Sequence, residues 1–290
     1  MSEKAEFRKN QNTTADIATE FVLKIQRPTG FCVEFGAWDG RYLLNSFALL
    51  NKFNYAGVLI EPDKRKFRKL CANYKDKKNV QCLNQLVGWF KNDSLDRILA
   101  GSACPKRFDF LSIDVDGNDW HIWKAVRVYQ PQIVCVEFNP TIPAGVEFVQ
   151  PADGKIQWGC SVASLLKLGL EKGYRPLHVG LRDVIFGSSD FTRYRGCPSR
   201  QANKTSQQLT NHIFIGYDGR ILLRGNRNLR WHGIRFYERD LQVLPQFLQK
   251  LPDSMNLFEK ICLRLFCLLR RWRRSWCRHL GFPWENPYDP

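Results

Sequence analysis

Hydrophobic positions over the first 190 residues alternate between short continuous runs and stripes of helical spacing. The continuous runs are bounded by turn residues, which is typical of strands buried on both faces of a parallel sheet. The stripes recur every three to four residues and predict amphipathic helices between those runs. Strands are expected at 31–36, 57–63, 80–90, 108–117, 132–139, 174–180 and 183–187. Helices are expected at 13–26, 41–52, 67–74, 94–100, 119–129 and 161–173.

This alternation predicts an α/β fold of the Rossmann-like kind, with a seven-stranded, mostly parallel sheet and helices on both faces. The last two strands are joined by a tight turn, so the final strand is expected to run antiparallel. We expect the α/β domain to cover residues 1–190 and a C-terminal extension to cover 191–290. Within the extension, 192–211 is expected to be a mobile loop or boundary and 212–225 a hairpin.

The net charge of +16 is concentrated in the extension, where residues 191–290 hold 18 Lys and Arg against 7 Asp and Glu. This balance indicates an anionic partner; the alternative interpretation is a solvated surface that binds no partner. The ten cysteines show no CxxC pair and no zinc-ligand spacing, and the first 30 residues lack a signal-peptide core. We therefore expect reduced, mostly buried thiols in a cytoplasmic protein.

Residues 257–280 predict one amphipathic helix that ends before Gly281. Several of its arginines gather within about 80° of one another, and a wide apolar stripe that includes Trp272 and Trp276 occupies another side. Three interpretations of such a helix are open: it packs on its own domain, it lies on an anionic membrane surface, or it binds nucleic acid. Nucleic acid is the least favoured of the three, and the membrane alternative would make the protein peripheral at the inner membrane surface.

Four expected strands end in acids, which places carboxylates along one edge of the predicted sheet. Glu34, Glu61, Asp114 and Glu137 stand at or beside the ends of the first, second, fourth and fifth strands. Open α/β sheets bind ligands beyond the carboxyl ends of their strands. Four acids in one layer are harder to explain as helix caps, although Asp119 is expected to be one.

A glycine turn follows the first strand at Gly36 to Gly40, and Glu61 lies 25 residues after Gly36. The turn allows a ligand to approach the backbone, and a carboxylate after the second strand accepts hydrogen bonds from ribose hydroxyls. A tight turn without a ligand is the alternative interpretation. The spacing lacks the middle glycine of the dinucleotide fingerprint, which disfavours a nucleotide-dependent oxidoreductase.

Four segments together resemble the class I S-adenosylmethionine-dependent methyltransferases, specifically the FkbM-like group. They are FCVEFGAWDG, GVLIEPD, FDFLSIDVDGNDW and IVCVEFNP. The resemblance is strong over residues 31–140, continues more weakly to about 190 and does not cover the last hundred residues. It implies a Rossmann-like domain that binds S-adenosylmethionine.

The resemblance also implies roles for residues of this chain. The expected cofactor-binding residues are Glu34, Gly36, Ala37, Asp39, Gly40, Glu61, Leu86, Val87 and Asp114. The glycine turn would face the methionine end of the cofactor, Glu61 would hold the ribose, and Asp114 would lie near the sulfonium. Leu86 and Val87 would lie near the adenine.

Methyl transfer aligns a nucleophile with the methyl carbon, and a hydroxyl nucleophile must also lose its proton. The catalytic candidates are Asp114, Asp116, His121 and Glu137. A divalent cation held by Asp114 and Glu137 is a less favoured way to acidify the hydroxyl, because two carboxylates fall short of a full site. Asn139 and the irregular segment 140–159 are expected to line the acceptor pocket.

The segment after the fourth strand disfavours methyltransferases that act on amino groups of bases. It holds Asp-Val-Asp-Gly (114–117) in place of a [DNS]-P-P-[FYW] run. Base methyltransferases with a nucleophilic cysteine are disfavoured as well, because no Pro-Cys pair follows the fourth or fifth strand. We expect an O-directed methyltransferase acting on a small-molecule, glycan or lipid-linked acceptor. The alternatives are an RNA methyltransferase that uses the basic extension and a non-catalytic cofactor-binding interaction module.

Overall fold

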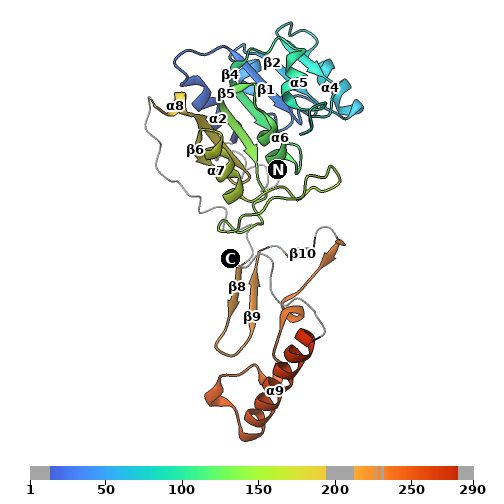
Figure 1. Cartoon of the computed structure of the whole chain (residues 1–290), viewed down its shortest axis with the longest axis vertical. Helices are drawn as coiled ribbons and strands as arrows, with labels where there is room; N and C mark the ends of the chain where they lie inside the picture. Colours follow the sequence, from blue (N-terminus) through green and yellow to red (C-terminus); the bar gives the residue numbers. More distant parts are fainter. Residues whose placement is uncertain (1–13, 194–211, 226, 230–231, 280–290) are drawn as a thin grey trace, which may run out of the picture. The chain divides into compact units, whose positions relative to one another are not determined.

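The computed structural model describes residues 14–193, 212–225, 227–229 and 232–279. The chain divides into two compact units, residues 1–210 and residues 211–290 (Figure 1). Residues 194–211, which make up most of the expected mobile stretch, lie outside the described part of the chain.

Seven strands of the first unit form one sheet (Figure 1). They are β1 (Phe31–Phe35), β2 (Ala56–Ile60), β3 (Val80–Leu83), β4 (Arg107–Ile113), β5 (Gln130–Glu137), β6 (Tyr174–Val179) and β7 (Asp183–Ser188). Their order is β3-β2-β1-β4-β5-β7-β6. The first five strands run parallel to one another, whereas β7 runs antiparallel to both β5 and β6. The predicted Rossmann-like fold with an antiparallel final strand is confirmed.

Helices cover both faces of this sheet. They are α2 (Thr14–Leu23), α3 (Phe47–Asn51), α4 (Lys64–Tyr74), α5 (Leu95–Ala100), α6 (Asp119–Ala125), α7 (Val162–Glu171) and α8 (Ser189–Arg193). One core joins α5, α6 and α7 to the face that carries Val33, and the other joins α2, α3 and α4 to the face that carries Cys32. Because successive side chains of a strand point to opposite faces, the continuous apolar run of β1 supplies both cores.

The helix starts follow from capping chemistry. Ser94 and Ser161 each accept a hydrogen bond from the backbone N–H three residues later, at the starts of α5 and α7. Asp63 accepts two backbone N–H groups at the start of α4. These side chains satisfy donors that the first turn of a helix leaves unpaired. The helices expected at 94–100 and 161–173 thus begin at capping serines.

Two expected elements are shorter than predicted. The helix expected over 41–52 begins only at Phe47, and the strand expected over 80–90 ends at Leu83. Leu43 has a φ of +53°, a left-handed backbone that a right-handed helix excludes. Its side chain is 73% exposed instead of lying in a buried stripe.

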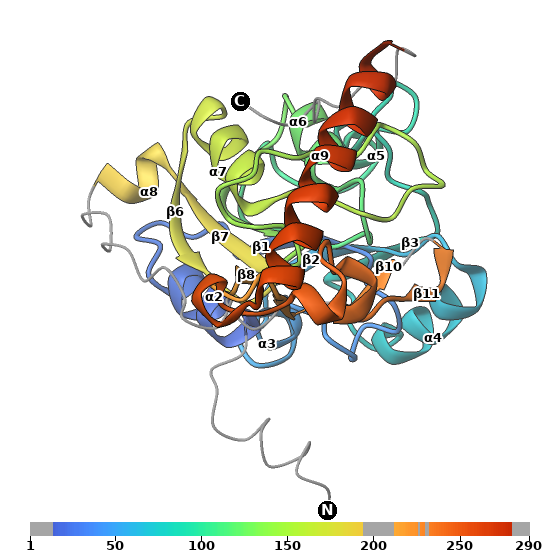
Figure 2. The same ribbon diagram turned by 90° about the horizontal axis from the view of Figure 1, so that it is seen from below.

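The second unit contains a hairpin, short turns and one long helix (Figure 1), and Figure 2 shows the length of this helix. Its elements are β8 (His212–Ile215), β9 (Ile221–Arg224), β10 (Asn228–Leu229), β11 (Ile234–Arg235), η3 (Glu238–Leu241), η4 (Gln246–Leu248), η5 (Pro252–Ser254) and α9 (Leu257–His279). The predicted hairpin and C-terminal helix are therefore confirmed. None of the helices in the described ranges is long and apolar enough to cross a membrane.

The cysteines agree with the expectation of free thiols. Eight of the ten have described side chains, and all eight are unpaired by disulfides. Cys32, Cys104, Cys135 and Cys160 are buried. Burial raises the pKa of Cys104 to about 12, which makes this thiol a weak nucleophile.

Candidate functional site

A cavity of about 290 Å³ lies at the carboxyl ends of β1, β2 and β4. The strand order reverses between β1 and β4, and ligands of open α/β sheets bind at such a point. The strand ends and their following loops supply the wall of the cavity. Its lining includes Gly36, Trp38, Glu61, Asp114, Asp116 and Glu137.

The turn after β1 contains glycines because other parts of the chain lie too close to it for a larger residue. Gly36 has a φ of +80°, and a Cβ there would overlap the carbonyl oxygen of Asp114. Gly40 has a φ of +78°, and a Cβ there would overlap the ring of Tyr74 on α4. Sequence reasoning had linked both glycines to the approach of a ligand, but their first role is to let β1 turn against β4 and α4. Only Gly36 of the two lines the cavity.

Glu34 and Asp39 shape this turn from outside the cavity lining. The buried carboxylate of Glu34 accepts the N–H of Asn45 at 3.0 Å, and the N–H and hydroxyl of Ser46 at 2.8 and 2.6 Å. Asp39 accepts the backbone N–H groups of the residues two and three places later, and the bond from Tyr42 contributes most to lowering the pKa of Asp39. Both acids therefore organise the loop before α3, and their predicted contact with a cofactor has no support in the cavity wall. Ala37 is buried and also lies outside the lining.

Glu61, the residue after β2, is buried at the cavity wall. One of its carboxylate oxygens accepts the N–H of Trp38 at 2.9 Å, and the other accepts the N–H of Asp63 at 2.9 Å. A carboxylate offers about four acceptor positions, so each oxygen retains one for a ligand. The two backbone bonds fix the orientation of the carboxylate before any ligand arrives.

Three non-glycine residues of the lining have a left-handed backbone. They are Trp38, Leu43 and Asp116, with φ angles of +49°, +53° and +56°. Elsewhere in the described ranges only Asn54 shares this property among non-glycine residues. Such conformations cost roughly 1–3 kcal/mol each and cluster where function needs their geometry. Their concentration around one cavity supports its assignment as the functional site.

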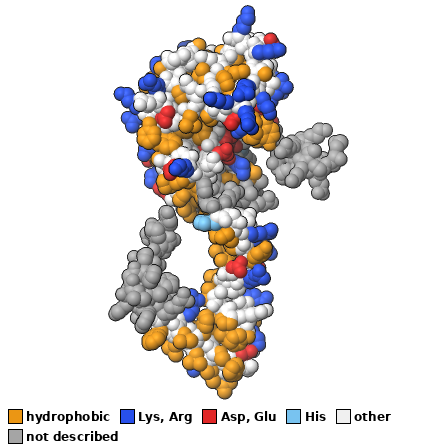
Figure 3. All heavy atoms as spheres, turned by 90° about the vertical axis from the view of Figure 1, so that its right-hand side faces the viewer, with side chains coloured by type: hydrophobic (Ala, Val, Ile, Leu, Met, Phe, Trp, Pro, Cys, Tyr) orange, Lys and Arg blue, Asp and Glu red, His pale blue; other side chains and the backbone are white. Residues whose placement is uncertain are grey.

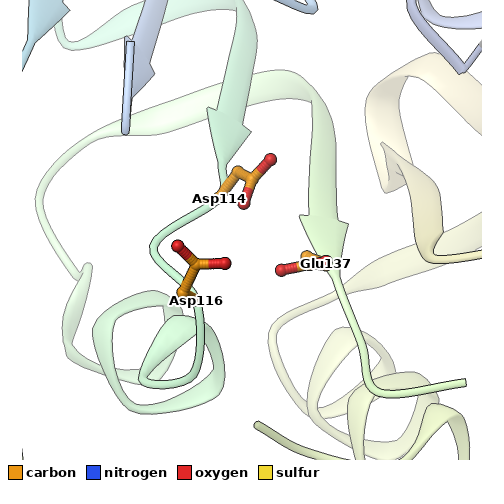
Figure 4. A group of neighbouring side chains, drawn as sticks. All are labelled: Asp114, Asp116 and Glu137. Atoms are coloured by element: carbon orange, nitrogen blue, oxygen red, sulfur yellow. The ribbon is translucent and has the colours of Figure 1, made fainter. Parts of the chain in front are cut away.

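Asp114, Asp116 and Glu137 converge at the cavity wall (Figure 4). Each places a carboxylate oxygen within 4.8 Å of the others. Asp114 follows β4, Glu137 ends β5, and Asp116, also a predicted catalytic candidate, lies in the loop before α6. These three residues form the carboxylate cluster of the site.

Two neighbours support the carboxylate cluster. Asp119, at the start of α6, accepts the N–H groups of Val115 and Gly117 at 2.9 Å each, and this holds the loop that carries Asp116. Burial raises the pKa of Asp119 to about 7. A guanidinium nitrogen of Arg182, in the turn between β6 and β7, lies 3.8 Å from a carboxylate oxygen of Glu137. Asp119 is therefore structural, but its predicted role as a helix cap is wrong: Asn118 occupies the N-cap position of α6, and Asp119 binds the loop that precedes the helix.

The two partly buried members of the carboxylate cluster, Asp114 and Glu137, do not ionise independently. Burial, followed by the charge of Asp114, raises the pKa of Glu137 to about 9. Burial, followed by the charge of Asp116, raises the pKa of Asp114 as well. Adjacent carboxylates in a poorly solvated place repel when both are charged, so each opposes the ionisation of the other.

Replacing Glu137 with glutamine is expected to stabilise the protein at alkaline pH. The pKa of Glu137 is raised from 4.5 to about 9 in the folded state, so between those values the folded chain binds a proton that the unfolded chain has lost. The free energy of unfolding therefore falls as pH rises through this range. Glutamine mimics the protonated acid and does not titrate. Urea unfolding should show equal stability near pH 4.5 and an advantage for Glu137→Gln of at least about 1 kcal/mol at pH 9.

A surface glutamate provides the control for this measurement. Glu147 is exposed and pairs with Lys167 at 2.8 Å, so Glu147→Gln should leave the pH profile parallel to that of the unsubstituted protein. A parallel profile for Glu137→Gln as well would show that Glu137 ionises as an ordinary carboxylate.

His121 and the irregular segment 140–159 lie outside the cavity lining. The Nε2 atom of His121 is 2.8 Å from the carbonyl oxygen of Gln150, and its ring packs 5.2 Å from that of Trp120. The side-chain amide of Asn139 donates to the carbonyl of Trp158 at 2.8 Å, which ties the segment to the end of β5. The predicted catalytic role of His121 and the predicted acceptor pocket therefore have no support in this cavity.

The remaining lining includes expected and unexpected residues. Leu86 and Val87 lie in the wall after β3, as predicted. Trp38, Lys66 and Arg182 were not predicted, because they come from separate loops and the first turn of α4. The ammonium of Lys66 lies 4.0 Å from the centre of the Trp38 ring. No sequence signal links these positions, since only the tertiary fold brings them together.

Two larger cavities lie at the opposite edge of the sheet. Their volumes are about 390 and 520 Å³, and both include the ion pair of Arg107 with Asp190. Arg107 begins β4 and Gln132 lies near the start of β5, so these cavities adjoin the amino ends of the strands. Ligands of this fold class bind at the carboxyl ends, where the carboxylate cluster lies. We therefore assign the site to the smaller cavity.

Comparisons with known proteins find distant structural likenesses. No protein-family model and no curated protein matches the chain. Among solved structures, a methyltransferase from Clostridium acetobutylicum described as S-adenosylmethionine-dependent is 8% identical, with a TM-score of 0.41 over 64% of this chain and 95% of that one. The pyocyanin biosynthetic protein PhzM is 10% identical, with a TM-score of 0.37 over 65% of this chain. The METTL16 methyltransferase domain is 12% identical, with a TM-score of 0.39 over 59% of this chain.

The chain spans less than two thirds of the latter two structures, 62% of PhzM and 64% of the METTL16 domain. Likenesses at this level carry no conclusion about activity or substrate. The proposals about activity and substrate rest instead on the geometry of the site.

Proposed function

We propose that this chain is an S-adenosylmethionine-dependent methyltransferase that acts in the 290 Å³ cavity. One observation carries the proposal: Glu61 after β2 and Asp114 after β4 flank the turn after β1 and line the same cavity at the switch point of the sheet. This arrangement is the one implied by the FkbM-like motifs, and we infer membership of that group from them.

The chemistry of the cavity wall suits S-adenosylmethionine. The fixed carboxylate of Glu61 retains acceptor positions for ribose hydroxyls. Leu86 and Val87 provide apolar surface for the adenine, and the carboxylate of Asp114 complements a positively charged sulfonium. These residues would hold the cofactor, whereas Glu34, Ala37, Asp39 and Gly40 shape the turn behind them.

The carboxylate cluster suits an oxygen nucleophile. When bound, the cofactor supplies a methyl group on a positive sulfur, and its transfer to an acceptor oxygen breaks the carbon–sulfur bond with the electron pair left on sulfur. The ionised member of the Asp114–Glu137 pair would accept the proton that the acceptor hydroxyl loses. A carboxylate with a raised pKa is a stronger base near neutral pH than an ordinary one. We therefore favour O-methylation.

The acceptor we propose is a hydroxyl of a small molecule, a glycan or a lipid-linked intermediate. The described residues of the cavity rim combine Trp38, Tyr42 and Lys66, which suit stacking on a ring and contact with an anionic group. The basic second unit keeps RNA as the alternative acceptor. A screen for methyl transfer to glycans, lipid-linked sugars and RNA separates these classes.

Loss of the Glu61 carboxylate is expected to weaken cofactor binding strongly. Calorimetry with S-adenosylhomocysteine should show that Glu61→Ala binds about 1.5–3 kcal/mol more weakly, because hydrogen bonds to a charged acceptor are removed. The same titration with NAD should show no binding by the unsubstituted protein. Binding of NAD in place of S-adenosylhomocysteine would replace the methyltransferase proposal with an oxidoreductase.

The neighbouring Asp63 provides a matched control. Asp63→Ala also removes a carboxylate close to the cavity, but this side chain caps α4 and does not line the cavity. It should cost about 1 kcal/mol of stability and leave affinity within threefold. Equal affinities for Glu61→Ala and the unsubstituted protein, both folded by circular dichroism, would remove Glu61 from the cofactor site.

A further inference from the structure

The long helix α9 carries two side-chain stripes of the same spacing on nearly opposite sides. One stripe consists of Glu259, Leu263, Phe266 and Arg270, and the other consists of Ile261, Leu265, Leu268 and Trp272. At 100° per residue the centres of the two stripes lie about 160° apart. We call the second stripe the apolar face of α9, because all four of its side chains are hydrophobic.

The side of α9 that is covered is not the apolar face. Glu259 is buried, and the other three members of its stripe are partly buried. Glu259 accepts the ammonium of Lys250 at 2.6 Å and the N–H of Asn256 at 3.0 Å, which fixes the start of the helix within the second unit. On the apolar face Leu265, Leu268 and Trp272 are 55%, 59% and 70% exposed. A surface helix normally buries its most apolar side, so this arrangement is reversed.

The charges around the apolar face indicate what covers it. Residues 257–279 contain seven Lys and Arg and a single acid, Glu259, which is already paired. Arg264 and Arg271 stand at one border of the apolar face, and both are exposed. Figure 3 shows hydrophobic side chains gathered at one end of the second unit, with Lys and Arg along its edge. The surface thus combines apolar area with a basic border.

We propose that the apolar face of α9 binds the surface of an anionic lipid bilayer, with the helix lying in the plane of the interface. A bilayer surface supplies acyl chains for the hydrophobic side chains and phosphate groups for the arginines. Residues 1–190 and the second unit both carry net positive charge, so neither the first unit nor a second copy complements the border. RNA would match the charge but leave the hydrophobic side chains uncovered. In the described part of the chain, α9 is not apolar enough over its length to span a membrane, which agrees with an in-plane position.

The test is co-sedimentation of the full-length protein with vesicles. Vesicles of phosphatidylcholine with about 30% phosphatidylserine should bind the protein, and raising the salt concentration should weaken binding. Pure phosphatidylcholine vesicles should bind at least about tenfold more weakly. The double variant Leu265→Glu/Leu268→Glu should reduce binding to the anionic vesicles by about tenfold or more. Two side chains that would contact the acyl chains are then replaced by carboxylates, which the anionic lipid repels.

A matched double variant separates the apolar face from net charge. Leu23 on α2 and Leu170 on α7 are 47% and 57% exposed, so Leu23→Glu/Leu170→Glu adds the same charge at similar exposure and should bind vesicles within threefold of the unsubstituted protein. Thermal melts should be alike for both double variants, since all four positions are exposed.

Three outcomes would overturn the proposal. One is vesicle binding that the α9 double variant leaves unchanged. Another is a self-associated protein that does not bind vesicles and that the α9 double variant converts to monomer. The third is binding of single-stranded RNA, unaffected by the α9 double variant, in the absence of any vesicle binding.

Discussion

Asp114→Asn is expected to lower the turnover of methyl transfer by about 100-fold or more while the protein stays folded. Asparagine keeps the size of the side chain but cannot accept a proton from the acceptor hydroxyl, and loss of a general base costs about 10²–10⁴ in rate. The fold should tolerate the change because it removes an acid whose pKa is already raised by burial. The measurement is transfer of a labelled methyl group to the acceptor found by screening, with circular dichroism as the check on folding.

Asp39→Asn is the matched control for this experiment. Asp39 lies in the turn after β1, outside the cavity lining, and an asparagine oxygen can accept the same two backbone N–H groups. Its turnover should stay within threefold of the unsubstituted protein. Turnover of Asp114→Asn in that same range would make Asp114 structural. Loss of turnover with EDTA and its return with magnesium would instead assign the carboxylate cluster to a cation.

Gly36→Ala is expected to lower the free energy of unfolding by about 2–5 kcal/mol, the largest effect on stability among these variants. Two causes add at this position. The φ of +80° is unfavourable for a side chain, and the new Cβ would overlap the carbonyl oxygen of Asp114. Either the turn after β1 or the end of β4 must then move, so binding of S-adenosylhomocysteine should weaken as well. Urea unfolding and calorimetry measure the two effects.

Gly30 separates the two causes. Its φ is +70°, but nothing lies within 4 Å of a Cβ placed there. Gly30→Ala should therefore lose only about 1 kcal/mol, from backbone strain alone. Equal losses at Gly30 and Gly36 would mean that the backbone of Asp114 moves freely away from the added methyl group.

The secondary structure could be predicted because its signal is local. Buried strands such as β1 and β5 are continuous apolar runs, and helices such as α4 and α7 carry an apolar stripe between capping and turn residues. Prediction was wrong at residues 41–46, where helical spacing was present. There the buried carboxylate of Glu34 binds backbone N–H groups of the loop and competes with helix formation.

The site could be predicted only in part. Glu61, Asp114 and Glu137 were found because parallel strands end at one edge of a sheet, so strand-end acids meet there. His121 was placed with them because it lies near the start of α6, but its ring turns to Trp120 and Gln150. The direction of a side chain on a helix depends on how the helix packs, which a local pattern does not contain.

The sequence by itself determined the succession of strands and helices along the chain, the end of the sheet at which the acids meet, and the amphipathic character of α9. These follow from the periodicity of hydrophobic residues and from the fact that the carboxyl ends of parallel strands lie at the same end of a sheet. Only the tertiary structure decided that His121 turns away from Asp114 and Glu137, that Arg182 reaches Glu137, and that α9 leaves its apolar face open. Those outcomes depend on backbone angles in loops and on contacts between residues distant in the chain, where small rotations redirect a side chain without changing the hydrophobic pattern.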